Sequence, residues 1–104
     1  MTKKRRIKFI VQAVRWFDRV NGNTYHSVRV TRCADGAVIA APFQYGYGDS
    51  YRQTALEVMA RAKWLPVKYR DGNMRYRYNM DNNYPINWNV CDGLKRDCVG
   101  NGVV

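Results

Sequence analysis

The chain of 104 residues has few of the side chains from which active sites and metal sites are usually built. It contains one histidine, three cysteines and eight acidic residues. Six residues separate Cys91 from Cys98, which is not the spacing of a zinc-binding pair, and an odd number of cysteines does not suit a disulfide framework. We therefore expect no metal site, no other cofactor and no disulfide.

Catalytic motifs are also absent. The sequence has no D-x-D, H-x-E or G-x-S-x-G motif and no glycine loop of the kind that binds phosphate. His26 is predicted to point toward the core, where a hydrogen-bonded structural histidine is more common than a general base. We expect a protein that is not an enzyme.

Long hydrophobic runs are missing as well. The basic start resembles the first part of a signal peptide, but Lys8, Gln12 and Arg15 interrupt the apolar stretch that should follow. No segment approaches the roughly 18 apolar residues of a membrane span. These features predict a cytoplasmic protein with reduced thiols.

Positive charge is the one excess in the composition. Eighteen lysines and arginines against eight acidic residues give a net charge of +10. Residues 1–32 hold nine basic side chains and one acidic, and residues 61–78 hold six basic and one acidic, with a nearly neutral segment between them. Such blocks favour a polyanionic partner such as nucleic acid; the alternative is that the charge serves only solubility.

The first half of the chain is typical of an antiparallel sheet. Its β-branched and aromatic residues predict three strands, at residues 7–19, 24–33 and about 37–45. Asn21-Gly22 and Asp35-Gly36 separate these strands, and both dipeptides favour two-residue hairpin turns because glycine adopts a positive φ without strain.

A helix is predicted after these strands. Ser50 and Gln53 have the spacing of a capping box, apolar residues then recur at helical intervals, and Pro66 ends the helix. The expected fold is a single small α+β domain, residues 1–104: a three-stranded antiparallel β-meander with one amphipathic helix packed on one face, plus a C-terminal hairpin and loop extension.

The two ends of the chain are expected to be less regular. Asp71-Gly72-Asn73 separates residues 67–70 from 74–78, which predicts a further hairpin. Residues 79–104 are rich in Asn, Asp and Gly and are expected to form a loop-rich extension with a short strand near 86–90. Residues 1–6 are expected to form a flexible basic arm.

Two-residue turns would fix which side chains share a face of the sheet. In that register Phe17 lies opposite His26, and Val28 lies opposite Phe43. The core face is apolar and carries Phe9, Val11, Ala13, Phe17, Val28, Val30, Ile39, Ala41 and Phe43. Arg15 and Arg32 also fall on that face, so we expect them to lie past the helix or beside a bulge. The other face is mixed and carries Lys8, Ile10, Gln12, Val14, Trp16, Tyr25, Ser27, Arg29, Thr31, Val38 and Gln44.

The mixed face is the first candidate binding surface. Lys8 and Arg29 are suited to phosphate groups, and Trp16 and Tyr25 offer rings on which bases can stack. The alternative is that the apolar members of this face form a second small core beneath the C-terminal segment.

Two other basic segments are candidates. Arg75, Tyr76 and Arg77 alternate cation and ring, which suits a ribbon that follows a phosphate backbone, or an edge strand that its arginines protect. The arm at the start of the chain can reach a neighbouring groove or phosphate, or it only keeps the protein soluble. Its cations are Lys3, Lys4, Arg5 and Arg6.

The stretch WFDRVNGNTYHSVRV at residues 16–30, followed by YGYGD at 45–49 and QTA at 53–55, resembles a recurrent type of small phage-encoded protein. The resemblance covers about residues 7–60 and implies a viral origin and a location in the host cytoplasm. That type has no assigned activity, so no functional residue is transferred. The expected meander and helix are also similar in layout to AP2-type and integrase arm-binding DNA domains, which insert the free sheet face into the major groove.

These observations lead to two functional hypotheses. The first is a non-enzymatic, phage-encoded protein that binds DNA or RNA through the mixed sheet face and the basic segments. The second is a phage accessory protein that binds a host protein and inhibits or redirects it. No membrane partner is expected, and the choice between DNA and RNA and the oligomeric state stay open.

Overall fold

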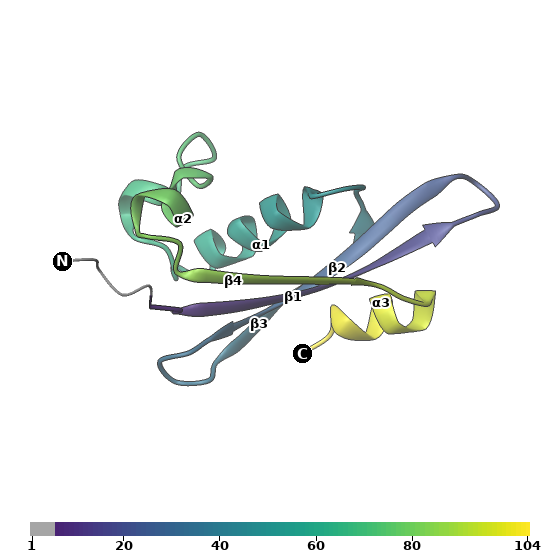
Figure 1. The fold of residues 1–104 in the computed structure, drawn as a ribbon, viewed down its shortest axis with the longest axis horizontal. Coiled ribbons are helices and arrows are strands. Elements are labelled where there is room, and N and C mark those ends of the chain that lie inside the picture. The colour runs from purple at the N-terminus through teal and green to yellow at the C-terminus, as the bar shows by residue number, and fades with distance from the viewer. Residues whose placement is uncertain (1–5) are drawn as a thin grey trace.

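The structure, a computed structural model, describes residues 6–104 and contains one mixed four-stranded sheet (Figure 1). The strands are β1 (Phe9–Asp18), β2 (Asn23–Arg32), β3 (Val38–Tyr45) and β4 (Ile86–Asp92), in the order β3-β2-β1-β4. The helices are α1 (Ser50–Arg61), α2 (Arg77–Asp81) and α3 (Lys95–Asn101), with a short 3₁₀ helix at Val67–Tyr69. The predicted α+β class is confirmed. In the described part of the chain, no helix is long and apolar enough to cross a membrane.

The predicted meander is only part of the sheet, because β4 lies on the other side of β1. β4 runs parallel to β1, from the pair Phe9–Ile86 to the pair Arg15–Asp92. Parallel strands must be joined by a long crossover connection. Here α1 and residues 62–85 form the connection that leads from β3 to β4. The short strand predicted near 86–90 is confirmed as β4, but residues 79–104 also form α3 and are more regular than the loop-rich extension that the sequence predicted.

The loop between β1 and β2 is two residues longer than predicted. Asp18 pairs with Asn23 across the hairpin, and the loop ends at Gly22 with a φ of 71°. The carboxylate of Asp18 accepts hydrogen bonds from the backbone N–H groups of Val20 and Asn21, at 3.0 and 3.3 Å. A side chain that satisfies two loop donors in this way favours the longer loop over the two-residue turn.

The loop between β2 and β3 is also longer than predicted: it runs from residue 33 to residue 37 and contains Gly36, with a φ of 74°. The predicted β1–β2 register is therefore wrong by two residues, and Phe17 lies opposite Thr24 rather than His26. The predicted β2–β3 register is wrong by two residues from Thr31 to Val28 and by one beyond that point. Because side chains alternate along a strand with a period of two, a two-residue shift leaves most of them on the predicted face.

A β-bulge between His26 and Val28 changes the face of one predicted core residue. Val28 pairs with Ala41, not with Phe43. Phe43 turns to the opposite face and stacks on Tyr25, with 4.9 Å between ring centroids. The bulge inserts an irregularity that the sequence pattern does not show.

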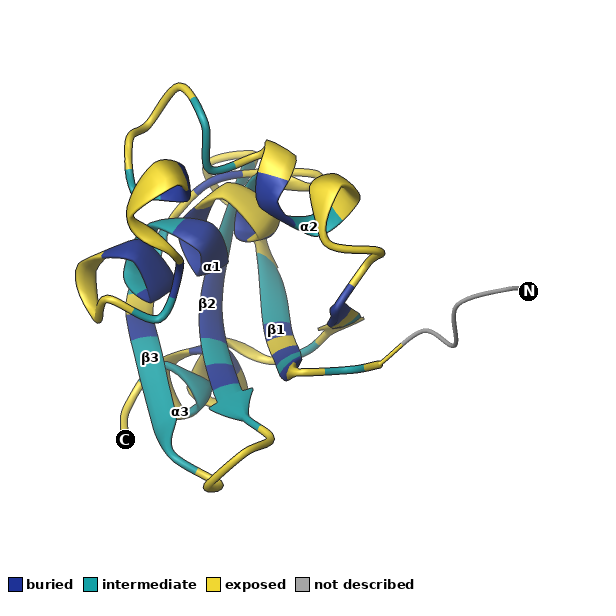
Figure 2. Ribbon diagram, turned by 90° about the vertical axis from the view of Figure 1, so that its left-hand side faces the viewer, coloured by how far each residue is buried: buried dark blue, intermediate teal, exposed yellow. Residues whose placement is uncertain are grey.

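The main core lies between the sheet and α1, where Figure 2 shows buried residues on the facing sides of both. Its buried members are Phe9, Val11, Ala13, Val28, Val30, Ala41 and Ile86 of the strands and Tyr51, Ala55, Leu56, Met59 and Ala60 of α1. Ile39 is partly buried against them. Phe17 is 54% exposed because β1 extends past the start of α1 (Figure 1).

The other face of the sheet, which we expected to be open, is covered by α3. Ser27 and Cys98 are fully buried there, and the hydroxyl of Ser27 donates to the backbone carbonyl of Cys98. The side-chain amide of Asn101 donates to the carbonyl of Gln12 at 3.1 Å, and the Cys98 thiol donates to the carbonyl of Val14 at 3.2 Å. The prediction of an open face is therefore wrong over the middle of the sheet, where the alternative of a covered face holds.

Residues 62–85 form turns and short helices, not the predicted hairpin. The backbone carbonyl of Asp71 accepts hydrogen bonds from the N–H groups of Met74 and Arg75, so the chain coils where a strand was expected to begin. Tyr78 is buried and meets Phe9 edge to face at 6.3 Å. Burial of this ring fixes the segment to the start of β1.

Candidate nucleic-acid interface

Cationic side chains gather at one end of the molecule. This basic end comprises the start of β1, the β2–β3 hairpin and residues 62–85, which lie together on the left of Figure 1. Its cations are Arg6, Lys8, Arg32, Lys63, Lys68, Arg70, Arg75 and Arg77. The carboxylates among them are Asp35, Asp71 and Asp81, so positive charge dominates.

Packed rings hold the basic end together. Phe9 stacks on Trp64 with 5.9 Å between ring centroids, and Tyr69 packs against Tyr78 at 5.4 Å. The guanidinium of Arg32 lies 4.6 Å from the centroid of the Trp64 ring. Because Phe9, Tyr69 and Tyr78 are buried, the backbone that carries the cations is fixed to the sheet.

Two arginines of the basic end are held in place by backbone carbonyls. Nε of Arg70 donates to the carbonyl of Leu65 at 2.8 Å, and Nε of Arg75 donates to the carbonyl of Arg70 at 3.1 Å. Within residues 6–104, the terminal amino groups of these two side chains have no acceptor. They are available for the oxygens of a phosphate group, and the side chains are already ordered.

Two other arginines are partly neutralised by carboxylates. Arg32 donates to both oxygens of Asp35, at 2.9 and 2.6 Å. These bonds raise the pKa of Arg32, and together with the backbone N–H of Ala37 they hold the pKa of Asp35 at about 2, below its ordinary 3.8. Arg77 lies 3.6 Å from Asp81. We expect both to attract an anion less strongly than the two arginines held by carbonyls.

Part of the predicted binding set lies at the basic end. Arg6 and Lys8 are exposed at the start of β1, and Arg75, Tyr76 and Arg77 lie on the neighbouring segment. Tyr76 is 66% exposed, so a base can reach its ring beside the two arginines. The remaining cations of the predicted arm, Lys3, Lys4 and Arg5, lie outside the described residues.

Trp16, Tyr25 and Arg29 lie on the face that α3 covers, and the structure does not bring them to the basic end. Nη2 of Arg29 donates to the backbone carbonyl of Val103. Nε of Arg29 is buried and has no partner among residues 6–104. Arg29 is therefore half-buried and held by the C-terminal residues, away from the basic end, and its expected role as a phosphate ligand stays a prediction.

Trp16 and Tyr25 belong to an aromatic cluster with Phe43 and Tyr45. Ring centroids are 5.8 Å apart between Trp16 and Tyr25 and 4.9 Å apart between Tyr25 and Phe43. The ammonium group of Lys95 lies 5.4 Å from the Trp16 ring. The faces of these rings pack against one another, so little ring surface is left on which a base can stack. Tyr45, 60% exposed, is its most open member.

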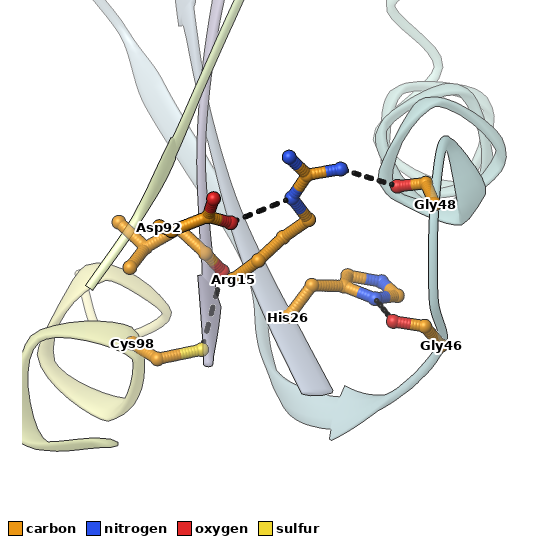
Figure 3. Close-up of polar contacts among 7 residues, drawn as sticks. Arg15, His26, Gly46, Gly48, Asp92 and Cys98 are labelled. Atoms are coloured by element: carbon orange, nitrogen blue, oxygen red, sulfur yellow. Dashed lines mark hydrogen bonds and ion pairs between the residues drawn. The ribbon is translucent and has the colours of Figure 1, made fainter. Parts of the chain in front are cut away.

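His26 is buried and hydrogen-bonded, as predicted. Its Nδ1 lies 3.1 Å from the carbonyl oxygen of Gly46 (Figure 3), and its Nε2 lies 2.8 Å from the hydroxyl of Thr54. A Cβ atom at Gly46 would lie 2.5 Å from Cε1 of His26, so this close approach requires glycine. The histidine thus connects β2 to α1 and to the segment before it.

An open cleft of about 950 Å³ lies at the end opposite the basic end, beyond β1 and β4. Arg15 lines it: Nε lies 3.2 Å from the carboxylate of Asp92, and Nη1 donates to the carbonyl of Gly48 at 3.1 Å (Figure 3). Exposed apolar side chains on its walls are Phe17, Val20 and Leu94. Sequence reasoning expected Arg15 to lie past the helix or beside a bulge, and it missed Asp92 because only the pairing of β1 with β4 brings these two residues together.

Within residues 6–104, no three histidine, cysteine or acidic side chains come together as metal ligands. Compared with known proteins, the chain matches no family model, no curated protein and no solved structure. No family is therefore assigned, and the functional argument rests on the arrangement of this chain's own residues.

Proposed function

We propose that the protein binds nucleic acid through its basic end, by contacts with the phosphate backbone and without a catalytic step. The observation that carries the proposal is the fixed pair of Arg70 and Arg75. Each side chain is anchored through Nε, and each leaves its terminal amino groups without an acceptor in the described chain. A guanidinium ordered in this way loses little side-chain entropy when it binds a phosphate.

The surrounding charge supports the same proposal. Lys8 and Lys68 are exposed at the same end, and no carboxylate lies within ion-pair distance of either among the described residues. A group of cations on one end raises the local concentration of a polyanion and speeds its association. Cations that served only solubility would not need to gather on one end or to be anchored by carbonyl groups.

Fluorescence anisotropy with labelled duplex DNA, single-stranded DNA and RNA tests this proposal and distinguishes the nucleic acids. Neutralisation of about four phosphates predicts that affinity for duplex DNA falls roughly a hundredfold between about 50 and 200 mM salt. No detectable binding at about 50 mM salt, or binding that does not change with salt, would contradict the proposal.

Charge-matched variants locate the contact. Arg70→Gln with Arg75→Gln removes two cations of the basic end, and Arg19→Gln with Arg96→Gln removes two exposed cations far from it. The first pair should weaken binding at least tenfold at about 50 mM salt and reduce the salt slope by about 2, because roughly 0.9 is lost for each phosphate contact. The second pair should weaken binding less than about threefold. Thermal unfolding checks that both variants are folded, and equal effects of the two pairs would place the contact elsewhere.

Binding to a protein is a second candidate, as for a phage accessory protein that inhibits or redirects a host protein. The cleft favours it, because exposed apolar walls beside Asp92 and Asp97 suit a segment with apolar and basic side chains. A pull-down from nuclease-treated host lysate separates the two functions. A partner that survives nuclease and is lost with Leu94→Asp supports protein binding, and loss of all partners after nuclease supports nucleic-acid binding.

A further inference from the structure

β4 is an edge strand whose outer side, from Trp88 to Asp92, is not covered by any other strand of the described chain, whereas at its start the N–H of Ile86 donates to the side-chain oxygen of Asn79 at 3.3 Å. The sheet order leaves β3 at one edge and β4 at the other. The helices that cover the sheet lie mainly over β1, β2 and β3 (Figure 1). Most side chains along β4 are exposed, among them Asn87, Asn89, Val90 and Cys91, whereas Ile86 is buried and Trp88 is partly buried against the main core.

The hydrogen bonds at the two ends of β4 show which of its residues face outward. The N–H of Phe9 donates to the carbonyl of Pro85, and the N–H of Gly93 donates to the carbonyl of Arg15. In a parallel ladder, alternate residues bond the same neighbour, so the odd positions of β4 face β1. Trp88, Val90 and Asp92 therefore turn their N–H and C=O groups to the open edge, where they are ready to pair with another strand.

The two edge strands differ in how well they are protected against pairing with a strand of another chain. β3 contains the exposed Pro42, which lacks an N–H donor and is typical of an edge that resists strand addition. β4 has no proline, and its pairing with β1 runs without a bulge. No charged side chain occurs from Ile86 to Cys91. From Ile86 to Cys91, β4 therefore has none of the prolines, bulges or charges that usually block an edge, and its one charged residue, Asp92, is at the end of the strand.

We propose that β4 pairs with β4 of a second copy of this chain, antiparallel and about a twofold axis. Pairing through the outward residues Trp88 and Val90 places Asn89 on the axis and Trp88 opposite Val90 of the second copy, and it does not use Ile86, whose N–H is bonded to Asn79. In that register the outward residues of both copies meet, so that their backbone groups can bond. An aromatic residue opposite a β-branched one is a favourable cross-strand pair, and a twofold contact is self-complementary.

The distribution of charge favours this contact and this direction. Two copies that each carry a net charge of +10 repel one another, so a contact is favoured where cations are few. The strip from Ile86 to Cys91 has no charged residue of its own, and the guanidinium of Arg52 lies against it, 5.1 Å from the centroid of the Trp88 ring. β4 begins beside Phe9, at the basic end, and finishes beside Arg15, at the cleft. Antiparallel pairing therefore puts the two basic ends at opposite extremes of the joined sheet, whereas parallel pairing would put them side by side.

Sedimentation equilibrium of the full chain without nucleic acid, from about 1 to 500 µM, tests the proposal. The wild type should form dimers. Val90→Pro removes an outward N–H that pairing with β1 does not use, and Val90→Lys places a charge at the edge. Both should raise the dimer dissociation constant at least tenfold, whereas Gln53→Lys, the same charge on the exposed side of α1, should leave it unchanged.

Each outcome of this experiment decides the proposal. A chain that stays monomeric at all concentrations overturns it, as does a dimer whose dissociation constant is the same in the wild type and in the Val90 variants. If Val90→Pro does not fold, as judged by thermal unfolding, then Val90→Lys and Gln53→Lys decide. If β4 instead pairs with an extended segment of another protein, the chain alone would stay monomeric at all concentrations, and the proposal of a dimer would be overturned.

Cross-linking tests the register. In a background of Cys33→Ser and Cys91→Ser, Asn89→Cys puts the two thiols together at the axis, and oxidised glutathione should link them, with two reduced glutathione molecules released for each disulfide. Asn87→Cys in the same background is the control, because its two thiols would lie four residues apart along the strands. Linking through Cys at 87 and not at 89 overturns the register.

Discussion

The two faces of the sheet are covered by helices of different chemistry. On one face α1 buries Ala55, Leu56 and Met59 against apolar strand residues. On the other face α3, only seven residues long, is attached largely through polar groups: the Ser27 hydroxyl and the Asn101 amide both donate to backbone carbonyls. The first contact removes apolar surface from water, and the second satisfies main-chain acceptors.

This difference implies different free energies of attachment. Burial of one large apolar side chain contributes about 1.5–3 kcal/mol, whereas one hydrogen bond contributes about 0.5–1.5 kcal/mol net. We therefore expect the face under α1 to determine the global free energy of unfolding. α3 should open locally, before the rest of the domain unfolds.

Met59→Ala should give the largest effect on stability. Met59 is 0% exposed in the main core, and a truncation there removes packing and leaves a cavity, which costs about 2–5 kcal/mol. Urea unfolding measures the change in the free energy of unfolding. A loss below about 1 kcal/mol would show that this face does not dominate.

Gly102→Ala should have a smaller and more local effect. A Cβ atom there would lie 2.9 Å from the carbonyl oxygen of Ala41 and 2.9 Å from Cα of Pro42, so the backbone of β3 blocks it. We expect a loss of about 1–3 kcal/mol, with faster amide exchange in α3 and little change in α1. The matched control is Gly100→Ala, where a Cβ meets no atom within 4 Å. Equal exchange in the two variants would show that α3 is not held against β3.

Asp35→Asn changes a surface turn outside both faces and should have the smallest effect. In the folded state the pKa of Asp35 is held at about 2 by Arg32 and the Ala37 N–H, below its ordinary 3.8. The charged form therefore stabilises the fold above about pH 4, and this contribution is lost as the pH falls from about 4 to about 2. Thermal unfolding of both proteins should show a difference at pH 6 that disappears at pH 2, and a constant difference would contradict it.

Local forces explain the parts of the fold that the sequence predicts. Alternating apolar residues place Val11, Val28 and Val30 in the core. This prediction holds despite the error in register, because a shift of two residues leaves a side chain on the same face of the sheet. α1 begins at Ser50 as predicted, although the Ser50 hydroxyl donates to the carbonyl of Tyr47 and the expected capping box is not formed. The pairing of β4 with β1 escapes prediction because it joins residues as far apart in the chain as Arg15 and Asp92.

The candidate site was predictable where it depends on charge and not where it depends on tertiary contacts. The clustering of basic residues pointed to Arg6, Lys8, Arg75 and Arg77, which do lie at the basic end. The anchoring of Arg70 by a carbonyl five residues away has no sequence signal. The partial covering of Arg29 depends on α3 and the residues after it, and the α3 sequence KRDCVGN lacks the apolar periodicity by which a packed helix is recognised.

The position of β1 inside the sheet has a consequence for synthesis of the chain. β1 precedes the other strands, yet one of its two neighbours is β4, and the contact between Arg15 and Asp92 spans 77 positions. During synthesis on the ribosome, the side of β1 that pairs with β4 therefore stays unpaired until the last quarter of the chain has emerged. Such long-range closure is slow compared with hairpin formation, so this late docking step should limit the folding rate and leave the nascent chain dependent on protection from aggregation.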